Sequence, residues 1–248
     1  MRDTERRLIV KAVFLAAGLG KRLHPITLKV PKGLIEIEGK TLLERAVETL
    51  EKFADPEKVI FVTGHGGNLI KDKFGLGERF LYVDNPHYST KNNIYSLYLA
   101  FPHIGDDSFL LFNSDVLFHP EILKRALAGS FDTFLIIDNT KELGEEEMKV
   151  IIENDRIRAI SKGLDPALSH GEYIGISRFS REGGRILRKH IEELIRNGKD
   201  GEFYEAGIQL MLDEYPVMAS YTGGLPWIEI DDHKDLEEAK EMARSWDL

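Results

Sequence analysis

Residues 11–34 read Lys-Ala-Val-Phe-Leu-Ala-Ala-Gly-Leu-Gly-Lys-Arg-Leu-His-Pro-Ile-Thr-Leu-Lys-Val-Pro-Lys-Gly-Leu. The apolar run 12–17 predicts a buried strand, and the glycines of 18–20 turn the chain directly after it. Glycine lets backbone N–H groups close on an anion, and the cations Arg22 and Lys32 follow at short range. Open α/β sheets bind phosphates at the carboxyl end of such a strand. The stretch therefore predicts an α/β fold that binds a polyphosphate.

The composition limits the class of protein. The chain has 248 residues, 42% of them hydrophobic, which is enough for one large α/β domain. A net charge of −9 argues against a nucleic-acid partner, although a nucleotide site needs only a few local cations. With no cysteine, disulfides and thiolate metal sites are excluded. No apolar run reaches membrane-spanning length, so we expect a cytoplasmic protein without stable membrane insertion.

Apolar strand patterns alternate with amphipathic helix patterns over the first 140 residues. This alternation predicts a Rossmann-like, mostly parallel mixed sheet with helices on both faces. The pattern Thr41-x-x-Glu44 is typical of a capping box at the start of the first helix. Strands are predicted at 11–17, 34–37, 58–63, 79–83, 108–113 and 133–138, and helices near 41–54, 67–75, 92–103 and 120–129.

The regular alternation of strand and helix patterns ends after residue 140, where a smaller mixed α+β lobe is predicted. We expect residues 1–248 to form a single domain, with a core at about 8–140 and 226–248 and the lobe at about 141–225. Within the lobe and after it, the pattern predicts a hairpin at 147–163 that turns at Asn154-Asp155, a strand at 172–178, helices near 181–197 and 202–214, a last strand at 227–230 and a charged C-terminal helix.

Two acids follow apolar strands and are candidate metal ligands. Asp115 ends the run 109–115, where the alternative is a turn or cap acid before the next helix. Asp231 ends the last strand, and Asp232 can serve as the N-cap of the helix that follows, which leaves Asp231 free. Glu229 shares a strand face with Asp231 and ranks behind it. Two carboxylates beside a polyphosphate favour Mg²⁺.

Polar residues that are candidate nucleotide contacts lie in the stretch 84–98. Its apolar residues follow helical spacing and are expected in the core, and Asn92 or Asn93 can cap that helix. Asn85, Asn93 and Ser96 are further polar side chains of this stretch, and the family resemblance described next implies that this region contacts base and ribose.

The motif string with Gly18, Gly20, Arg22 and Lys32 resembles the signature of the sugar-nucleotidyltransferase superfamily, the pyrophosphorylase-type nucleotidyltransferases. The stretch 92–98 is similar to inositol-1-phosphate cytidylyltransferases and bacterial phosphocholine cytidylyltransferases. The resemblance implies that Arg22 binds the β- and γ-phosphates and Lys32 approaches the reacting α-phosphate. It also implies that Mg²⁺ binds Asp115 and Asp231, so that Lys32, Arg22 and Asp115 are the catalytic candidates. The implied nucleotide-binding residues are Ala16, Ala17, Gly18, Leu19, Gly20, Arg22, Lys32, Asn85, Asn93 and Ser96.

The resemblance further implies transfer of a cytidylyl group from CTP to a phosphorylated small alcohol. We favour inositol 1-phosphate, because 147–149 and 204–209 hold few aromatic residues for a choline cage. Lys162 and Glu205 are the acceptor-binding candidates, and Lys149 and Gln209 are also available.

Several alternatives remain open at this point. They are a phosphocholine or sugar-1-phosphate nucleotidyltransferase and, in another class, a non-catalytic nucleotide-sensing subunit. A membrane-bound alcohol-phosphate transferase that consumes the product is an expected downstream partner.

Overall fold

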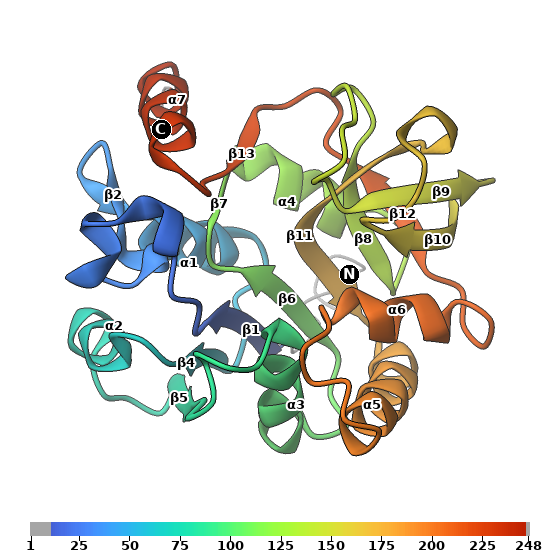
Figure 1. The fold of residues 1–248 in the computed structure, drawn as a ribbon, viewed down its shortest axis with the longest axis horizontal. Helices are drawn as coiled ribbons and strands as arrows, with labels where there is room; N and C mark the ends of the chain where they lie inside the picture. Colours follow the sequence, from blue (N-terminus) through green and yellow to red (C-terminus); the bar gives the residue numbers. More distant parts are fainter. Residues whose placement is uncertain (1–10, 247–248) are drawn as a thin grey trace, which may run out of the picture.

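A nine-stranded mixed sheet forms the centre of the protein in the computed structural model, which describes residues 11–246 (Figure 1). The strand order is β5-β4-β1-β6-β11-β8-β12-β10-β9. Its strands are β1 (Lys11–Ala16), β4 (Val59–Thr63), β5 (Phe80–Asp84), β6 (Phe109–Asn113), β8 (Phe134–Asp138), β9 (Lys149–Glu153), β10 (Arg156–Ser161), β11 (Gly171–Phe179) and β12 (Met218–Tyr221).

Two small antiparallel sheets and seven α-helices complete the described part of the chain. The small sheets pair β2 (Glu36–Ile37) with β3 (Lys40–Thr41) and β7 (Val116–Phe118) with β13 (Trp227–Glu229). The helices are α1 (Leu42–Phe53), α2 (Gly67–Phe74), α3 (Asn93–Ile104), α4 (Pro120–Ala128), α5 (Arg181–Arg196), α6 (Glu205–Met211) and α7 (His233–Arg244). Single 3₁₀ turns lie at Lys21–Leu23, Ile26–Leu28, Lys32–Leu34 and Pro166–Leu168.

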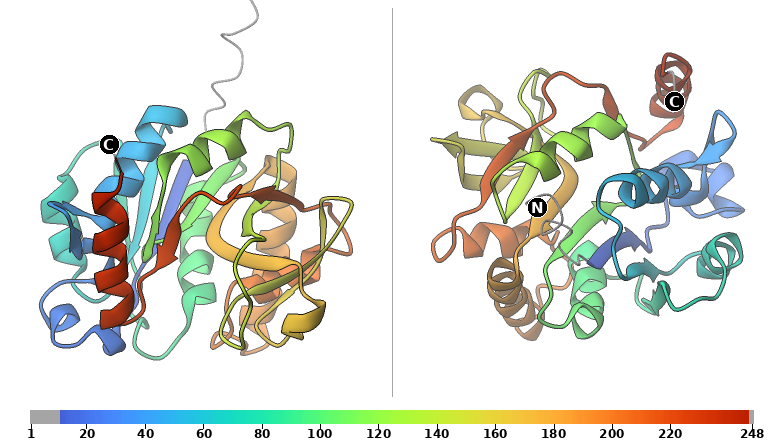
Figure 2. Two further views of the ribbon diagram at one scale, coloured as in Figure 1. Left: turned by 90° about the horizontal axis from the view of Figure 1, so that it is seen from above. Right: turned by 180° about the vertical axis from the view of Figure 1, so that it is seen from behind.

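Helices cover both faces of the sheet, as the alternation of apolar segments predicts (Figure 2). Val13 and Leu15 of β1 belong to a core cluster with α3, α5 and α6. Ala12 and Phe14, whose side chains point to the opposite face, pack with α1, α2 and α4. The expected α/β fold class is therefore confirmed.

The register of β1 fixes where its loop lies. β1 pairs in parallel with β4 and with β6, and Leu15 stands opposite Asn113. Because the carboxyl ends of parallel strands meet at one edge of a sheet, the chain after Ala16 runs beside the chain after Asn113. The glycine loop and the acid that follows β6 are thus brought together.

The predicted lobe at 141–225 contributes strands to the same sheet. β11 is antiparallel to β6 and β8, whereas β12 is parallel to β8. The hairpin turns at Asn154 and Asp155, which have φ angles of 51° and 60°, as a two-residue turn requires. The boundaries of the lobe stay a prediction, and the expected core start at residue 8 and end at 248 lie outside the described residues.

Some predicted elements differ from the observed ones. In the predicted strand at 34–37, Leu34 ends a 3₁₀ turn, and only Glu36–Ile37 pair as a strand. The helix expected at 202–214 is shorter and spans Glu205–Met211. The strands β7 and β12 were not predicted; β7 has only three residues and pairs with a segment more than 100 positions away.

The C-terminal helix α7 packs against the segment that follows the glycine loop. Leu236, Ala239 and Ala243 of α7 form a third core cluster with Leu23 and Ile37, among others. This packing holds the segment around Lys32 next to the end of β13.

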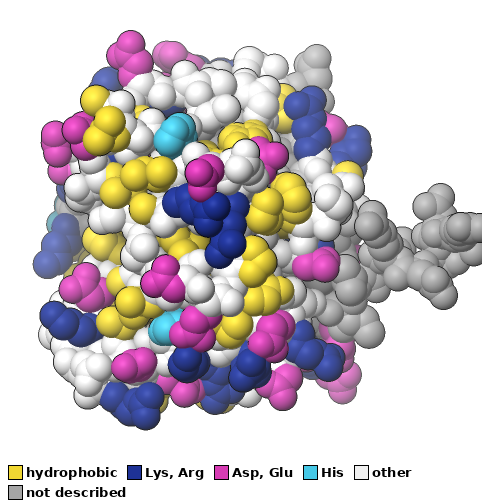
Figure 3. Space-filling view, turned by 90° about the vertical axis from the view of Figure 1, so that its right-hand side faces the viewer, with side chains coloured by type: hydrophobic (Ala, Val, Ile, Leu, Met, Phe, Trp, Pro, Cys, Tyr) yellow, Lys and Arg dark blue, Asp and Glu magenta, His cyan; other side chains and the backbone are white. Residues whose placement is uncertain are grey.

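On the face shown in Figure 3, a small group of positive side chains lies near the centre between hydrophobic and acidic side chains, and other positive side chains lie towards the edges. None of the helices among residues 11–246 has the length and apolarity that a membrane span requires.

Candidate active site

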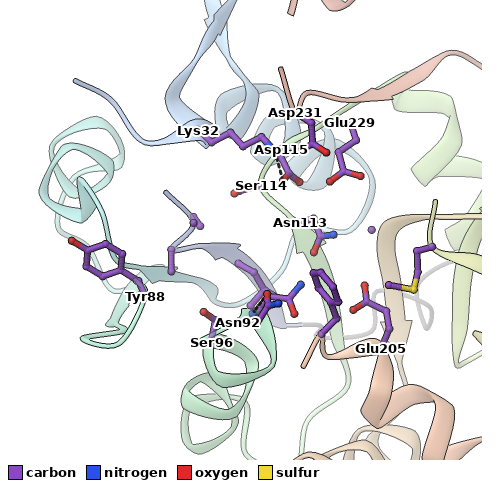
Figure 4. Close-up of a pocket in the computed structure, with 18 of the residues that line it drawn as sticks. Lys32, Tyr88, Asn92, Ser96, Asn113, Ser114, Asp115, Glu205, Glu229 and Asp231 are labelled. Carbon is purple, nitrogen blue, oxygen red and sulfur yellow. Dashed lines mark hydrogen bonds and ion pairs between the residues drawn. The ribbon is translucent and has the colours of Figure 1, made fainter. Parts of the chain in front are cut away.

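A cavity of about 350 Å³ opens at the carboxyl ends of β1 and β6, a volume that suits a small-molecule site. Figure 4 shows the side chains that point into it. Most predicted site residues line its wall, namely Ala16, Ala17, Gly18, Arg22, Lys32, Asn85, Asn93, Ser96, Asp115, Lys162, Glu205 and Asp231. Leu19 and Gly20 do not line it.

The two glycines of the loop have different roles. A Cβ atom added at Gly18 would meet no atom within 4 Å, so bare backbone faces the cavity there. At Gly20 the φ angle is +57°, and an added Cβ would lie 2.9 Å from Cγ2 of Thr27. The hydroxyl of Thr27 donates to the carbonyl of Gly20 at 2.7 Å. Gly20 therefore fixes the shape of the loop, and Gly18 leaves room for a ligand.

An ion-pair cluster connects the loop to both predicted metal acids. The ammonium of Lys32 lies 2.8 Å from Oδ2 of Asp115 and 2.7 Å from Oδ1 of Asp231. The guanidinium of Arg22 contacts Oδ2 of Asp231 at 2.7 Å, and this side chain is 66% exposed, whereas that of Lys32 is 11% exposed. Lys32 is thus held in place, and Arg22 is accessible to an incoming anion.

Strand pairing brings these acids together from distant parts of the sequence. β13 runs antiparallel to β7, with Glu229 opposite Val116, and the N–H of Ile230 donates to the carbonyl of Asp115 at 3.0 Å. Asp232 caps α7 by accepting from the backbone of Lys234 and Asp235, as the sequence predicts. The chain is therefore anchored on both sides of Asp231.

The acids and the lysine shift each other's protonation. Although burial opposes it, the charges of Asp115 and Asp231 raise the pKa of Lys32. Burial alone would raise the pKa of the Asp231 carboxyl, but Lys32 and Arg22 hold this pKa below its usual value. Desolvation and the two neighbouring carboxylates raise the pKa of Glu229. The cluster thus holds more negative charge than Lys32 alone can neutralise.

The donor set fits a magnesium ion. Carboxylate oxygens of Asp115, Glu229 and Asp231 lie within 4.8 Å of one another. The buried Oδ1 atom of Asp115 has no hydrogen-bond partner, which is an energetically unfavourable state for a carboxylate oxygen. Magnesium prefers such oxygen ligands together with phosphates. Glu229, which the sequence ranked behind the two aspartates, is part of this group.

The polar residues on the nucleotide side are tied into the fold. Asn85 donates to the hydroxyl of Ser96 at 3.0 Å and accepts from the N–H of His87 at 2.9 Å. The side-chain oxygen Oδ1 of Asn93 accepts a hydrogen bond from the backbone N–H of Tyr204 at 2.9 Å. These three candidates line the cavity wall, and their contact with a base stays a prediction.

The opposite end of the cavity holds Lys162 and Glu205, the two acceptor candidates. The ammonium of Lys162 lies 3.9 Å from Glu146 and 5.4 Å from the ring centre of Phe203. Glu205 is buried, and its Oε2 atom has no hydrogen-bond partner. Burial raises the pKa of Glu205 to about 7, against the effect of hydrogen bonds and of Lys162.

Two other residues that the sequence suggested as acceptor contacts, Lys149 and Gln209, form hydrogen bonds with backbone groups instead. The side chain of Lys149 is buried, and its ammonium donates to the carbonyls of Gly144 and Glu145 at 3.0 Å and of Glu147 at 3.1 Å. Gln209 accepts from the N–H of Ile160 at 2.8 Å.

Comparison with known families assigns the first half of the chain. The model of the MobA-like NTP transferase domain matches residues 12–134, which include the glycine loop, Lys32 and Asp115. Residues 12–134 form an NTP transferase domain.

Relatives of this NTP transferase act on several acceptors, according to their names. A protein from Streptomyces rubellomurinus named CMP-5'-(3-aminopropyl)phosphonate synthase is 38% identical over 244 residues, covering 93% of this chain and 38% of the relative. A bifunctional IPC transferase and DIPP synthase from Aquifex aeolicus is 28% identical over 238 residues, covering 94% and 51%. The chain thus spans about half or less of the length of these curated relatives.

Solved structures share the fold of this NTP transferase. The inositol-1-phosphate CTP transferase from T. maritima superposes with a TM-score of 0.77 at 23% identity, covering 97% of this chain and 98% of that one. The CTP:phosphocholine cytidylyltransferase from Streptococcus pneumoniae gives 0.75 at 22% identity, covering 95% and 100%.

The sequence did not identify part of the cavity wall of this NTP transferase. Asn113 and Ser114 come directly before Asp115, so their place at a strand end was a usable signal. No local pattern marks Tyr173 or Phe203, two aromatic residues that line the same cavity and lie outside the stretches 147–149 and 204–209, where few aromatic residues were noted. They lie 30 residues apart in the sequence.

Proposed function

We propose that this NTP transferase uses Mg²⁺ to transfer the cytidylyl group of CTP to a small acceptor that carries a phosphate or phosphonate group, with release of pyrophosphate. The observation that supports this proposal best is the cluster of Lys32 with Asp115, Glu229 and Asp231 beside an open glycine loop. A polyphosphate needs the loop and the cations, and a divalent ion needs the acids.

The chemistry requires no nucleophile from the protein. An anionic oxygen on the acceptor phosphorus attacks the α-phosphorus of CTP, and the bond to the β-phosphate oxygen breaks as pyrophosphate leaves. Magnesium, held by Asp115 and Asp231 with Glu229 beside them, would neutralise charge on the phosphates. Lys32 would stabilise the charge that develops at the α-phosphate, and Arg22 would hold the leaving pyrophosphate. The protein thus aligns two anions that repel each other in water.

In this proposal Lys32 and the metal compete for the same oxygens. The ammonium of Lys32 lies between Asp115 and Asp231 in the ligand-free arrangement. If Asp115 and Asp231 held the metal through these oxygens, they would no longer pair with Lys32. The lysine is then free to turn towards the α-phosphate at the time when the nucleotide is bound.

The names of the relatives support CTP and two kinds of acceptor. Inositol 1-phosphate, which the sequence favours, is supported by the IPC transferase and by the T. maritima enzyme. A phosphonate with an amino group is supported by the relative that shares 38% identity. Both acceptors present the same attacking group, so the proposed reaction covers both.

The test measures pyrophosphate release in the presence of Mg²⁺. CTP, UTP, GTP, ATP and dTTP are each combined with inositol 1-phosphate, phosphocholine, glucose 1-phosphate and 3-aminopropylphosphonate. We expect turnover with CTP and one acceptor class, and loss of turnover with EDTA. CTP binding without turnover on any acceptor would instead favour a nucleotide-sensing subunit, and turnover only with UTP or dTTP and glucose 1-phosphate would favour a sugar-1-phosphate nucleotidyltransferase.

A further inference from the structure

The acceptor end of the cavity contains a buried acid whose second oxygen atom is unpaired. Glu205 begins α6, is 5% exposed, and lines the cavity together with Met148 and Phe203. Its Oε2 atom has no hydrogen-bond partner. In Figure 4 its carboxylate points into the cavity, on the far side of Asn113 from the cluster of Asp115, Glu229 and Asp231.

We propose that Glu205 binds a protonated amino group at the end of the acceptor that is remote from its phosphorus atom. The acceptor is then an aminoalkyl phosphonate or phosphate ester. This inference rests on the proposed function, because the phosphorus end of the same molecule must reach the cluster around Lys32.

A protonated amine satisfies this carboxylate better than a hydroxyl group does. Lys162 is a cation whose charge acts on Glu205, but its side chain is 42% exposed and also lies near Glu146 and Phe203. A hydroxyl group would give Oε2 its missing hydrogen bond and leave the buried negative charge without a partner. An ammonium group supplies both the N–H donor and the opposite charge.

The groups around Glu205 hold the carboxylate in a fixed position. The hydroxyls of Tyr204 and Tyr173 lie 2.9 Å apart, and that of Tyr173 donates to Ser177 at 3.0 Å. Tyr204 also donates to Oδ1 of Asn113 at 3.3 Å. Glu205 thus lines the cavity beside a buried network of hydroxyl groups, and its buried Oε2 atom has no hydrogen-bond partner.

The remaining wall suits a short chain of methylene groups that ends in a cation. The side chains of Met148, Tyr173 and Phe203 line this end of the cavity. Aromatic faces attract cations, and apolar side chains accept methylene groups without a loss of hydrogen bonds. A polyol such as inositol would place several hydroxyl groups against the same surfaces. The wall therefore favours the aminoalkyl acceptor.

Burial disfavours the negative charge of Glu205 as long as no cation is bound beside it. Desolvation raises the pKa of its carboxyl to about 7, so the ligand-free protein carries this group partly protonated near neutral pH. A bound ammonium favours the ionised form, and binding of the amine and ionisation of Glu205 support each other.

The test compares acceptors that differ only in the charge of the remote group. Initial rates are measured with CTP and Mg²⁺ for 3-aminopropylphosphonate and for 3-hydroxypropylphosphonate, its uncharged counterpart. We expect kcat/KM to be about 10- to 100-fold higher for the amine, the range for a hydrogen bond to a charged group. Equal kcat/KM values for the two phosphonates, or a higher value for inositol 1-phosphate, would overturn the inference and leave the proposed function intact.

The second arm uses the isosteric variant Glu205→Gln. We expect it to raise the KM of the amine at least 10-fold, to leave the KM of CTP unchanged, and to remove the preference over the hydroxyl compound. Glu146→Gln, which alters an exposed acid of the same cavity, is the matched control and should keep the preference. A Glu205→Gln enzyme that still prefers the amine contradicts the assignment. Bound CTP without turnover on any acceptor removes the proposed function and this inference together.

Discussion

Replacing Lys32 with methionine should tighten magnesium binding while it slows catalysis. The ammonium of Lys32 contacts the same two acids, at 2.8 and 2.7 Å, that are proposed to bind the metal. Ligand oxygens lie about 2 Å from Mg²⁺, so the two cations would be about 4 Å apart if both stayed in place. At that separation a single and a double charge repel by about 2 kcal/mol even with the dielectric constant of water.

This repulsion corresponds to a change of about 30-fold in the dissociation constant of Mg²⁺. Lys32→Met removes the positive charge and keeps a side chain of similar length, so the ligand-free variant should bind Mg²⁺ about 30-fold more tightly. Turnover should fall about 10²- to 10³-fold, because a positioned charge is absent from the transition state. The opposite signs of the two effects distinguish competition from a general loss of structure.

Isothermal titration calorimetry with MgCl₂ measures the first effect, and pyrophosphate release at saturating CTP measures the second. Lys29→Met, which removes an exposed lysine from the same loop region, is the control and should change neither quantity. A Lys32→Met variant with unchanged or weaker Mg²⁺ binding would refute the competition between lysine and metal. A variant that keeps its turnover within a few-fold would refute the role of Lys32 in the reaction.

Three further substitutions test other parts of the structure. Arg22→Ala should raise the KM of CTP about 10-fold in initial-rate measurements and change folding stability little, because this side chain is 66% exposed. Asp138→Ala should lower the free energy of unfolding in urea by about 2 kcal/mol, since it removes the acceptor for Trp227 and Thr140. Although burial opposes them, these hydrogen bonds lower the pKa of Asp138, so the stabilisation is present above about pH 4 and should be lost as the pH falls further. Gly20→Ala should lower stability by about 2 kcal/mol more than Gly39→Ala, because a new Cβ at Gly20 meets Cγ2 of Thr27 at 2.9 Å, whereas a new Cβ at Gly39, which also has a positive φ, meets no atom within 4 Å.

Much of the nucleotide-binding half could be predicted because its signals are local. The strand before Gly18 is a short apolar run, and its glycines and cations follow within a few residues. Asp115 comes after β6, whose carboxyl end lies at the same sheet edge as that of the parallel strand β1. Asp231 also comes after an apolar strand, although that strand pairs antiparallel with β7 in a separate sheet. The capping boxes at Thr41 and Asp232 also depend on side chains only three residues apart.

The acceptor end could not be predicted to the same extent, because distant pairings decide its chemistry. Glu205 follows an ordinary loop, and only the packing of Tyr173 and Tyr204 shows that its carboxyl is buried. The residues next to Lys149 in the sequence do not distinguish it from a surface lysine, yet its ammonium donates to three backbone carbonyls. Glu229 joins the other acids only through the pairing of two three-residue strands. Local sequence contains no signal for such contacts.

The two ends of the cavity differ in how firmly the fold holds them. Asp115 and Asp231 are fixed by strand pairing and by the cap of α7, so a change there would disturb the core as well as the metal site. Lys162 and Phe203 are 42% and 39% exposed and sit on segments that carry no central strand of the sheet. If these two residues bind the acceptor, as we propose, we expect substitutions there to change the acceptor preference and to leave the fold intact. The chemistry at the α-phosphate is therefore expected to be the more constant property of this scaffold, and the acceptor must be identified from the residues around Glu205.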